Sequence, residues 1–389
     1  MYRTYTAAAA AVSTCASLSG LTASADEASI ITGSTVIGQD YGLPTGTPVH
    51  GETEPGSVEF VVEVATFLKT MERGDLDGFE LGSTDSENYF GFLAPVRGRF
   101  RPHERITFEL GVVLADDLGE AENFYGTDED IDPVAPLVRL AVEPWDDIYL
   151  IAGTLVPTHW SHQALFDDTN KFDETTEQGV QFRADTSFLK NDTWVNWRLR
   201  DGNLNSDEYE IGSSTQLRLF DDVLRLDGQV HWMNVAGPGA EFTLVESNLA
   251  GLLGASVGLH APFGLELVED ARIGVAAMES SDDTYIINSE DGSGWETSAT
   301  VDLRTSNDTF VRLKASQFEG DGLIARRGDV LYTQDSYSQI AATGIWDLGA
   351  GFRLEAGADL QDANEDTNWT AKVNLTWGGA YFGDLLTFW

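Results

Sequence analysis

Residues 105–114 read RITFELGVVL, and their alternation decides the fold class. Apolar side chains occupy every second position: Ile106, Phe108, Leu110, Val112 and Leu114. Polar side chains fall between them at the start of the stretch: Arg105, Thr107 and Glu109. A period of two is typical of a β-strand with one apolar and one polar face, and about ten residues cross a bilayer at a tilt. The stretch therefore predicts a membrane-spanning β-strand.

The same alternation recurs along the chain from about Val58, for example in residues 193–200, 223–234 and 369–377. Seven short turns alternate with eight long polar segments, and together they join sixteen strands. The short turns are expected near Arg101–Glu104, Glu143–Asp147, Leu189–Asp192, Phe220–Val223, Ala261–Gly264, Thr305–Asp308 and Asp347–Gly351. The long segments are expected at about 69–88, 115–133, 156–177, 201–208, 236–248, 279–293, 319–335 and 361–368. This asymmetry predicts an all-β, antiparallel transmembrane barrel with short periplasmic turns and long extracellular loops.

The two ends of the chain refine this architecture. Residues 1–25 are expected to be a cleaved signal peptide, with Arg3 before an apolar stretch and Ala23-Ser24-Ala25 as the cleavage site. Cys15 inside it leaves a lipoprotein signal as an alternative. Residues 26–56 are expected to be an N-terminal periplasmic segment, and 57–389 the barrel domain. A further strand at 381–389, paired with one from the N-terminal segment, would raise the number of strands to 18.

Composition excludes several classes of protein. The 23 basic and 64 acidic residues give a net charge of -41, so nucleic acid is not an expected partner. No run of 18 or more apolar residues follows the N-terminal stretch, so a helical membrane protein is not expected. The terminal Phe388 and Trp389 resemble the assembly signal that the insertion machinery recognises in bacterial outer-membrane proteins. These features predict a location in the outer membrane of a Gram-negative cell, in contact with outer-membrane lipid and lipopolysaccharide.

Basic residues concentrate on the polar face of the predicted strands, whereas acids crowd into long segments such as 115–132 and 279–291. In a barrel, the polar face of each strand is the lumenal face. The predicted pore-lining residues are Arg97, Arg99, Arg105, Arg139, Arg183, Arg198, Arg200, Arg218, Arg225, Arg312, Lys314 and Arg353. Two interpretations stay open. One is a basic wall along a hydrated path, and the other is a generic polar lining in which ion pairs neutralise the charges.

The long segment 156–177 follows the fifth predicted strand and is rich in acids. If it folds inward, its carboxylates would face the arginines and form a constriction that selects solutes by charge. The predicted constriction residues are Asp167, Asp168, Asp173, Glu174 and Glu177.

Short motifs on either side of this segment resemble the porin superfamily. They are Ala152-Gly153-Thr154-Leu155-Val156-Pro157 before it and Gly179-Val180-Gln181 after it. The resemblance implies a barrel of 16 to 18 strands, an inward loop at this position and a homotrimer. The constriction-loop motif of general porins has no close counterpart here, so a particular selectivity is not implied.

Sites for chemistry are weak in the sequence. His159 and His162 form an H-x-x-H pair near Asp167 and Asp168, but two histidines at this spacing are common, and no metal site is predicted. Ser161 and His162 are adjacent, so their side chains point apart, and no catalytic group can be assembled. No cofactor is expected, although acidic loops such as 128–132 leave Ca²⁺ binding as an alternative.

The sequence as a whole predicts a non-enzymatic channel for passive diffusion of small hydrophilic solutes or ions. Two alternatives stay open. The first is a non-conducting outer-membrane barrel that acts as an adhesin, receptor or structural protein, with residues 26–56 as a plug. The second is a soluble secreted β-protein.

Overall fold

The structure is a computed structural model of the chain. It describes residues 55–72, 87–117, 134–156, 159–166, 176–200, 207–236, 245–260, 267–283, 290–306, 309–349, 352–363 and 366–382. The expected signal peptide, most of the segment 26–56 and the terminal Phe388 and Trp389 lie outside these ranges. Within the described residues, no helix is long and apolar enough to cross a bilayer.

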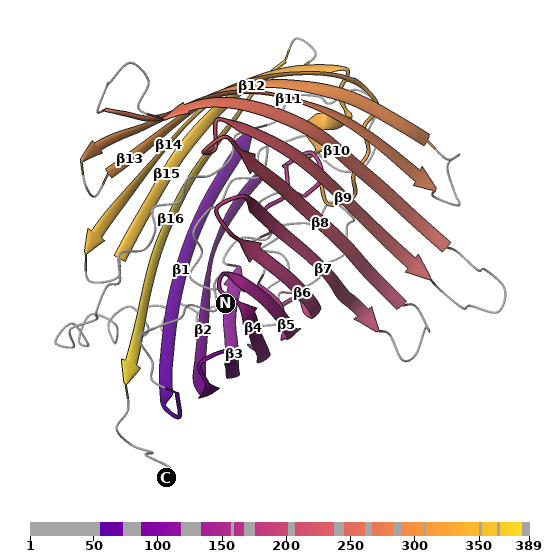
Figure 1. Cartoon of the computed structure of the whole chain (residues 1–389). Coiled ribbons are helices and arrows are strands. Elements are labelled where there is room, and N and C mark those ends of the chain that lie inside the picture. The colour runs from indigo at the N-terminus through magenta and orange to yellow at the C-terminus, as the bar shows by residue number, and fades with distance from the viewer. Residues whose placement is uncertain are drawn as a thin grey trace, which may run out of the picture.

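Sixteen antiparallel strands form a closed barrel (Figure 1). Each strand pairs with its neighbours in sequence, and β1 pairs with β16 to close the ring. The strands are β1 (Val58–Glu72), β2 (Glu87–His103), β3 (Ile106–Asp117), β4 (Val134–Trp145), β5 (Ile148–Thr154), β6 (Gln178–Asp185), β7 (Leu189–Arg200), β8 (Asp207–Leu219), β9 (Leu224–Ala236), β10 (Val245–His260), β11 (Val268–Asp283), β12 (Glu290–Ser306), β13 (Thr309–Asp321), β14 (Ser336–Gly349), β15 (Phe352–Ala363) and β16 (Asp366–Phe382). The sixteen-stranded barrel is confirmed, and because β1 pairs directly with β16, the described ring holds sixteen strands rather than 18.

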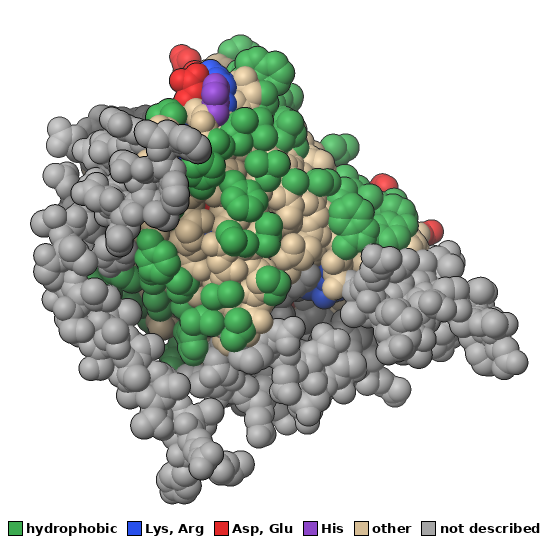
Figure 2. All heavy atoms as spheres, turned by 90° about the horizontal axis from the view of Figure 1, so that it is seen from below, with side chains coloured by type: hydrophobic (Ala, Val, Ile, Leu, Met, Phe, Trp, Pro, Cys, Tyr) green, Lys and Arg blue, Asp and Glu red, His purple; other side chains and the backbone are tan. Residues whose placement is uncertain are grey.

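Side-chain polarity in the barrel is inverted relative to a soluble β-protein. On β9, Leu226 and Val230 point outward and are exposed, whereas Arg225, Asp227 and His231 point inward and are buried. The same alternation holds on β4, where exposed and buried residues follow one another along the strand. In Figure 2, hydrophobic side chains spread over the outer surface of the strands, and charged side chains appear mainly at its margins. An apolar outer band around a polar interior is the arrangement of a barrel that spans a bilayer.

Where the structure describes the predicted short turns, they match except at one place. The turn predicted at Ala261–Gly264 lies outside the described residues, as do parts of those at Thr305–Asp308 and Asp347–Gly351. Phe220, Asp221 and Asp222 close the β8–β9 turn in left-handed backbone conformations, as expected for a tight hairpin. The turn predicted at Leu189–Asp192 is wrong, because β7 begins at Leu189 and Thr186 closes the turn before it through backbone and side-chain bonds to Leu189. Asn191 and Asp192 look like turn residues in the sequence, but both are buried residues of β7. Asp192 faces inward, whereas Asn191 lies on the opposite face of the strand and donates to Thr215 Oγ1.

The connection between β13 and β14 also differs from the exposed polar loop that the sequence predicts. It contains a short 3-10 helix, η2 (Val330–Thr333), which begins after the N-cap Asp329. Leu323, Leu331 and Tyr332 in this connection are almost fully buried. These side chains pack in one apolar cluster with inward-facing residues of β10, β11 and β13. The connection therefore folds into the barrel.

Candidate functional site

Two chain segments fill part of the barrel interior. The first is the start of the β5–β6 connection, of which the structure describes residues 155–156 and 159–166. The barrel wall holds its backbone at the point where it leaves β5. Arg139 donates from Nε to the Thr154 carbonyl and from Nη2 to the Leu155 carbonyl, each at 2.8 Å. The Gln181 side chain accepts from the Val156 N–H at 2.9 Å and donates to its carbonyl at 3.2 Å. These bonds direct the backbone of Leu155 and Val156 inward from the end of β5.

His159 is the most enclosed ionisable group of this segment. Its Nδ1 lies 2.9 Å from Asp192 Oδ2, and its Nε2 lies 2.7 Å from Glu177 Oε2. The ring stacks on Trp194 with centroids 3.6 Å apart and meets the Phe166 ring edge-on. Burial lowers the pKa of His159, but the two carboxylates outweigh burial and raise it to about 10. The side chain is therefore an imidazolium that joins two buried carboxylates.

The next residues of the segment continue these contacts. Trp160 contacts two cations of the wall, with Arg183 Cζ 4.1 Å and Lys190 Nζ 4.2 Å from its ring centroid. Its carbonyl accepts from Ser214 Oγ at 2.5 Å. The N–H of His162 donates to Gln229 Oε1 at 2.7 Å. Cation–π contacts and hydrogen bonds thus fix the segment against β6 to β9.

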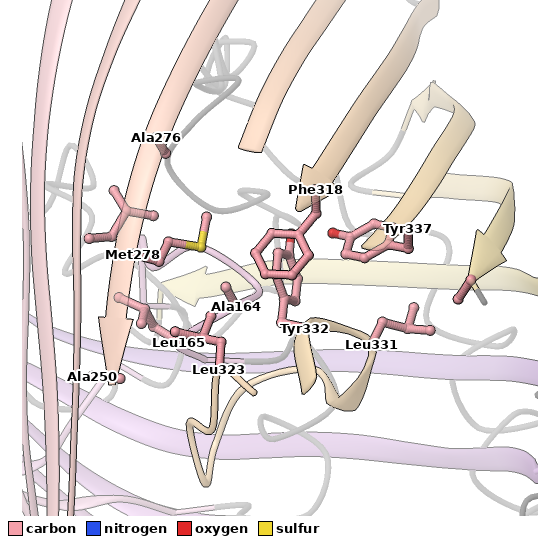
Figure 3. Close-up of a cluster of buried hydrophobic side chains, with 12 residues drawn as sticks. Ala164, Leu165, Ala250, Ala276, Met278, Phe318, Leu323, Leu331, Tyr332 and Tyr337 are labelled. Carbon is pink, nitrogen blue, oxygen red and sulfur yellow. The ribbon is translucent and has the colours of Figure 1, made fainter. Parts of the chain in front are cut away.

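The second inner segment comprises residues 322–335 and lies against the first. The Asp329 N–H donates to the Gln163 carbonyl at 2.9 Å. Gly328 lies so close to Ala164 that a Cβ atom at position 328 would come within 2.2 Å of the Ala164 carbonyl oxygen. Figure 3 shows the apolar contacts of the two segments, in which Leu165 and Leu323 lie among Met278, Phe318 and the side chains of η2. We call residues 155–156, 159–166 and 322–335 together the inner shelf.

Two carboxylates of the wall bind the inner shelf from different strands, β8 and β12. Glu296 on β12 accepts from Tyr332 Oη at 2.6 Å and lies 3.6 Å from His162 Nε2. Glu210 on β8 lies 3.6 Å from Arg327 Nε, and it also accepts from Trp194 Nε1 at 3.1 Å. Each carboxylate therefore pairs with a polar or cationic group of the shelf, which compensates for its burial.

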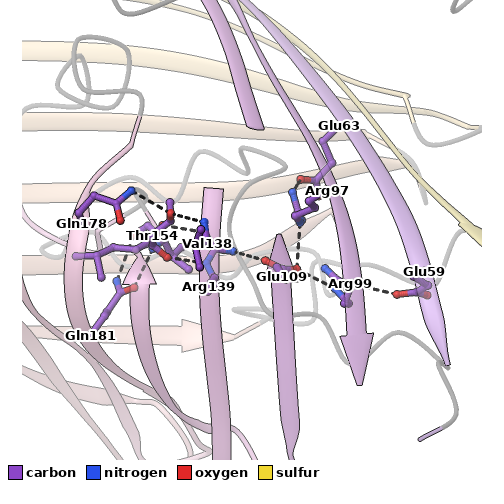
Figure 4. A network of polar contacts seen from close by, with 12 residues as sticks. Glu59, Glu63, Arg97, Arg99, Glu109, Val138, Arg139, Thr154, Gln178 and Gln181 are labelled. Atoms are coloured by element: carbon purple, nitrogen blue, oxygen red, sulfur yellow. Dashed lines mark hydrogen bonds and ion pairs between the residues drawn. The ribbon is translucent and has the colours of Figure 1, made fainter. Parts of the chain in front are cut away.

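A second polar cluster lies on the inner face of β1 to β4 (Figure 4). Glu109 on β3 is its centre and accepts from three guanidinium groups, those of Arg97, Arg99 and Arg139, at 2.8 to 3.0 Å. Arg97 also bonds to Glu63 at 2.5 Å, and Arg99 bonds to Glu59 at 3.3 Å. Three cations thus face three carboxylates, so the cluster carries no net charge.

The predicted pore-lining residues lie on the inner face with few exceptions, and most are paired with carboxylates. The paired residues are Arg97, Arg99, Arg139, Arg183, Arg198, Arg218, Arg225, Arg312 and Lys314. Arg353 shares its face of β15 with the buried Glu355. Arg105 instead lies at the β2–β3 turn, where it bonds to Asp146 in the adjacent turn between β4 and β5. The side chain of Arg200 lies outside the described residues. Of the two interpretations that the sequence leaves open, these pairs favour a lining neutralised by ion pairs.

Only one of the predicted constriction residues can be placed. Glu177 is buried and pairs with His159. The others, Asp167, Asp168, Asp173 and Glu174, lie outside the described residues. Their proposed role as an acidic constriction therefore stays a prediction.

The contacts of the interior histidines show whether these residues are arranged as a metal or catalytic site. His159 and His162 of the H-x-x-H pair bond to different carboxylates, on β7 and β12 respectively. In the described part of the chain, no group of three or more His, Cys, Asp or Glu side chains is arranged to hold a metal ion. His231 Nε2 lies 3.0 Å from Glu210. The histidines of the interior thus contact carboxylates and act as bridges between elements.

Comparison with known protein families identifies a relationship that the motifs in the sequence do not reveal. The profile of the lipid A 3'-O-deacylase-type family matches residues 52–360, which is most of the barrel. The chain belongs to this family. None of the curated proteins matches the sequence. The barrel implied by the resemblance to porins is present, and membership of this family adds lipid A chemistry to the functions to be considered.

Three solved structures with a similar fold are remote in sequence. OmpT, an outer-membrane protein of Vibrio cholerae, is 9% identical, with a TM-score of 0.49 over 85% of this chain and 100% of that one. The anion-selective porin from Comamonas acidovorans is 10% identical, with a TM-score of 0.46 over 83% and 99%. OccAB3 of Acinetobacter baumannii is 12% identical, with a TM-score of 0.43 over 83% and 99%. Similarities this distant carry no argument about function.

Proposed function

We propose that the chain forms an outer-membrane channel through which small hydrophilic solutes diffuse passively. The observation that supports this proposal best is the polar, ion-paired inner face of a closed sixteen-stranded barrel. The diameter of a barrel grows with the number of strands, and side chains alone fill a barrel of about 8 strands, whereas 16 leave room for water. The inner shelf lies across part of this space and would set the width of the path.

The charge of the inner face supports only weak ion selectivity. The three arginines around Glu109 are balanced by three carboxylates, and Arg312 and Lys314 each have a carboxylate partner as well. A neutralised lining produces a small field along the path, so charge would not strongly exclude either sign of ion. We expect a reversal potential close to zero in a salt gradient.

Liposome swelling tests this function. Proteoliposomes that contain the folded barrel should swell in isosmotic solutions of small neutral sugars and resist larger oligosaccharides. Empty liposomes carried through the same detergent removal serve as the control. Swelling equal to that of empty liposomes, from protein whose gel migration is heat-modifiable, would contradict the channel.

A second candidate function is ester hydrolysis on lipid A, favoured by the match to the deacylase-type family over residues 52–360. Such a reaction needs a general base that activates water and donors for the oxyanion, within reach of lipid in the outer leaflet. The buried imidazolium of His159 bonds to carboxylates on both sides, so it is a poor candidate for the base. The test is mass spectrometry of lipid A after incubation with the folded protein. Loss of one 3'-O-acyl chain would support the enzyme, and unchanged lipid A would contradict it.

A further inference from the structure

One side chain of the barrel wall bonds directly to the backbone of the β13–β14 connection. Asn248 on β10 is fully buried and bonds to the connection twice. Its Nδ2 donates to the Ile324 carbonyl at 2.9 Å, and its Oδ1 accepts from the Arg326 N–H at 3.1 Å. The amide thus pairs with the backbone as a neighbouring strand would.

Polar contacts on both sides of this amide align the same stretch. The Ile324 N–H donates to Ser280 Oγ on β11 at 2.9 Å. Arg326 Nε lies 3.5 Å from Asp282, also on β11. Arg327 faces the other way, toward Glu210 on β8, and its guanidinium carbon lies 5.0 Å from the centre of the Phe166 ring. The connection therefore spans the interior between β8 and β11.

This stretch also supports the other half of the inner shelf. The bond from Asp329 to Gln163 and the close approach of Gly328 to Ala164 join residues 322–335 to residues 159–166. An ordered backbone of this kind inside the barrel reduces the cross-section open to solutes. A displaced connection would widen the path and remove a support from the first segment.

We infer that residues 322–335 determine the size limit of the channel, and that the amide of Asn248 positions them. This inference rests on the proposed channel function. It assigns size discrimination to the connection between β13 and β14 in addition to the acidic segment 156–177. Asn248 is a positioning residue, because it acts through the backbone that it holds.

Two variants test the inference by independent routes. Asn248→Ala removes both bonds to the connection. Gly328→Ala leaves Asn248 intact but places a Cβ against the Ala164 carbonyl, which forces the two halves of the shelf apart. The matched control is Gln339→Ala, a buried inward amide on β14 that bonds to the wall residue Ser316.

Trypsin reports displacement of the connection directly, because it cleaves after Arg326 and Arg327. Folded wild-type protein and the control should resist cleavage there, and both test variants should be cut. In planar bilayers, the single-channel conductance of both variants should rise on the order of twofold, and proteoliposomes should admit larger oligosaccharides.

The outcomes separate this inference from the channel itself. A wild-type barrel that neither conducts nor swells liposomes overturns the proposed function. If the wild type conducts but both variants keep its conductance and size limit, the channel stands and only the inference is overturned. This holds whether or not trypsin cuts the variants. If one variant does not fold, as judged by heat-modifiable migration, the other still decides.

Discussion

His159 shows how a single buried charge can join separate parts of the interior. It links Glu177, at the end of the β5–β6 connection, to Asp192 on β7. Removal of the imidazolium by His159→Gln leaves two buried carboxylates without their common counter-ion. Breaking a buried pair in this way costs about 3–5 kcal/mol. We therefore expect a lower urea midpoint for unfolding from detergent micelles, whereas His103→Gln at the exposed β2–β3 turn should change it little. Equal midpoints for the two variants would contradict the bridging role.

The raised pKa of His159 also gives this contribution a definite pH dependence. The group is protonated in both folded and unfolded chains below about pH 6.5, so its stabilisation is complete there. As pH rises from there toward 10, the unfolded chain loses the proton while the folded chain retains it, and the stabilisation is lost as pH passes the folded pKa of about 10. The difference in unfolding free energy between wild type and His159→Gln should shrink between about pH 6 and pH 10. A constant difference over this range would show that the imidazole is not held charged.

At the scale of the strands, the cluster around Glu109 joins β1, β2 and β4 through one carboxylate on β3. Glu109→Gln would leave three guanidinium groups facing only Glu59 and Glu63. We expect a loss of about 3–5 kcal/mol, measured as the shift in unfolding free energy in urea. Glu269→Gln is the matched control, because Glu269 pairs with Arg304 in a partly exposed position, where about 0–1 kcal/mol is expected. Similar losses in both variants would refute the central role of Glu109.

The strands were predictable from the sequence because each repeats a two-residue period with one apolar face. The outward and inward residues of β9 follow the alternation of residues 223–234 residue by residue. The turn at Leu189–Asp192 was misplaced because Asn and Asp favour turns locally, whereas pairing with β6 and β8 holds these residues in a strand.

The inner shelf was only half predictable. The acidic segment 156–177 stood out by its length and by its resemblance to porins. The burial of residues 322–335 depends on Asn248, Ser280 and Glu296, which lie on other strands and have no distinctive spacing along the chain. The signal that was present is the apolar content of the connection, in Leu323, Leu331 and Tyr332, which an exposed polar loop would not carry.

For the molecule as a whole, the family match and the geometry of the barrel point to different functions. Membership of the lipid A 3'-O-deacylase-type family gives the ancestry of the barrel, and it keeps hydrolysis of lipid A as a function to be tested. The closed ring of sixteen strands with a polar interior favours passage of solutes. The two functions require different groups, because passage requires an open path and hydrolysis requires a base near the lipid.

The conductance of the wild-type barrel in a planar lipid bilayer tests the proposed channel most directly. Protein refolded in detergent, and shown to be folded by heat-modifiable migration, is added to one side of the membrane in a salt gradient. We expect discrete, stable conductance steps and a reversal potential near zero, because the described basic residues of the inner face are mostly paired with carboxylates. Folded protein that inserts without conductance steps would contradict the central claim.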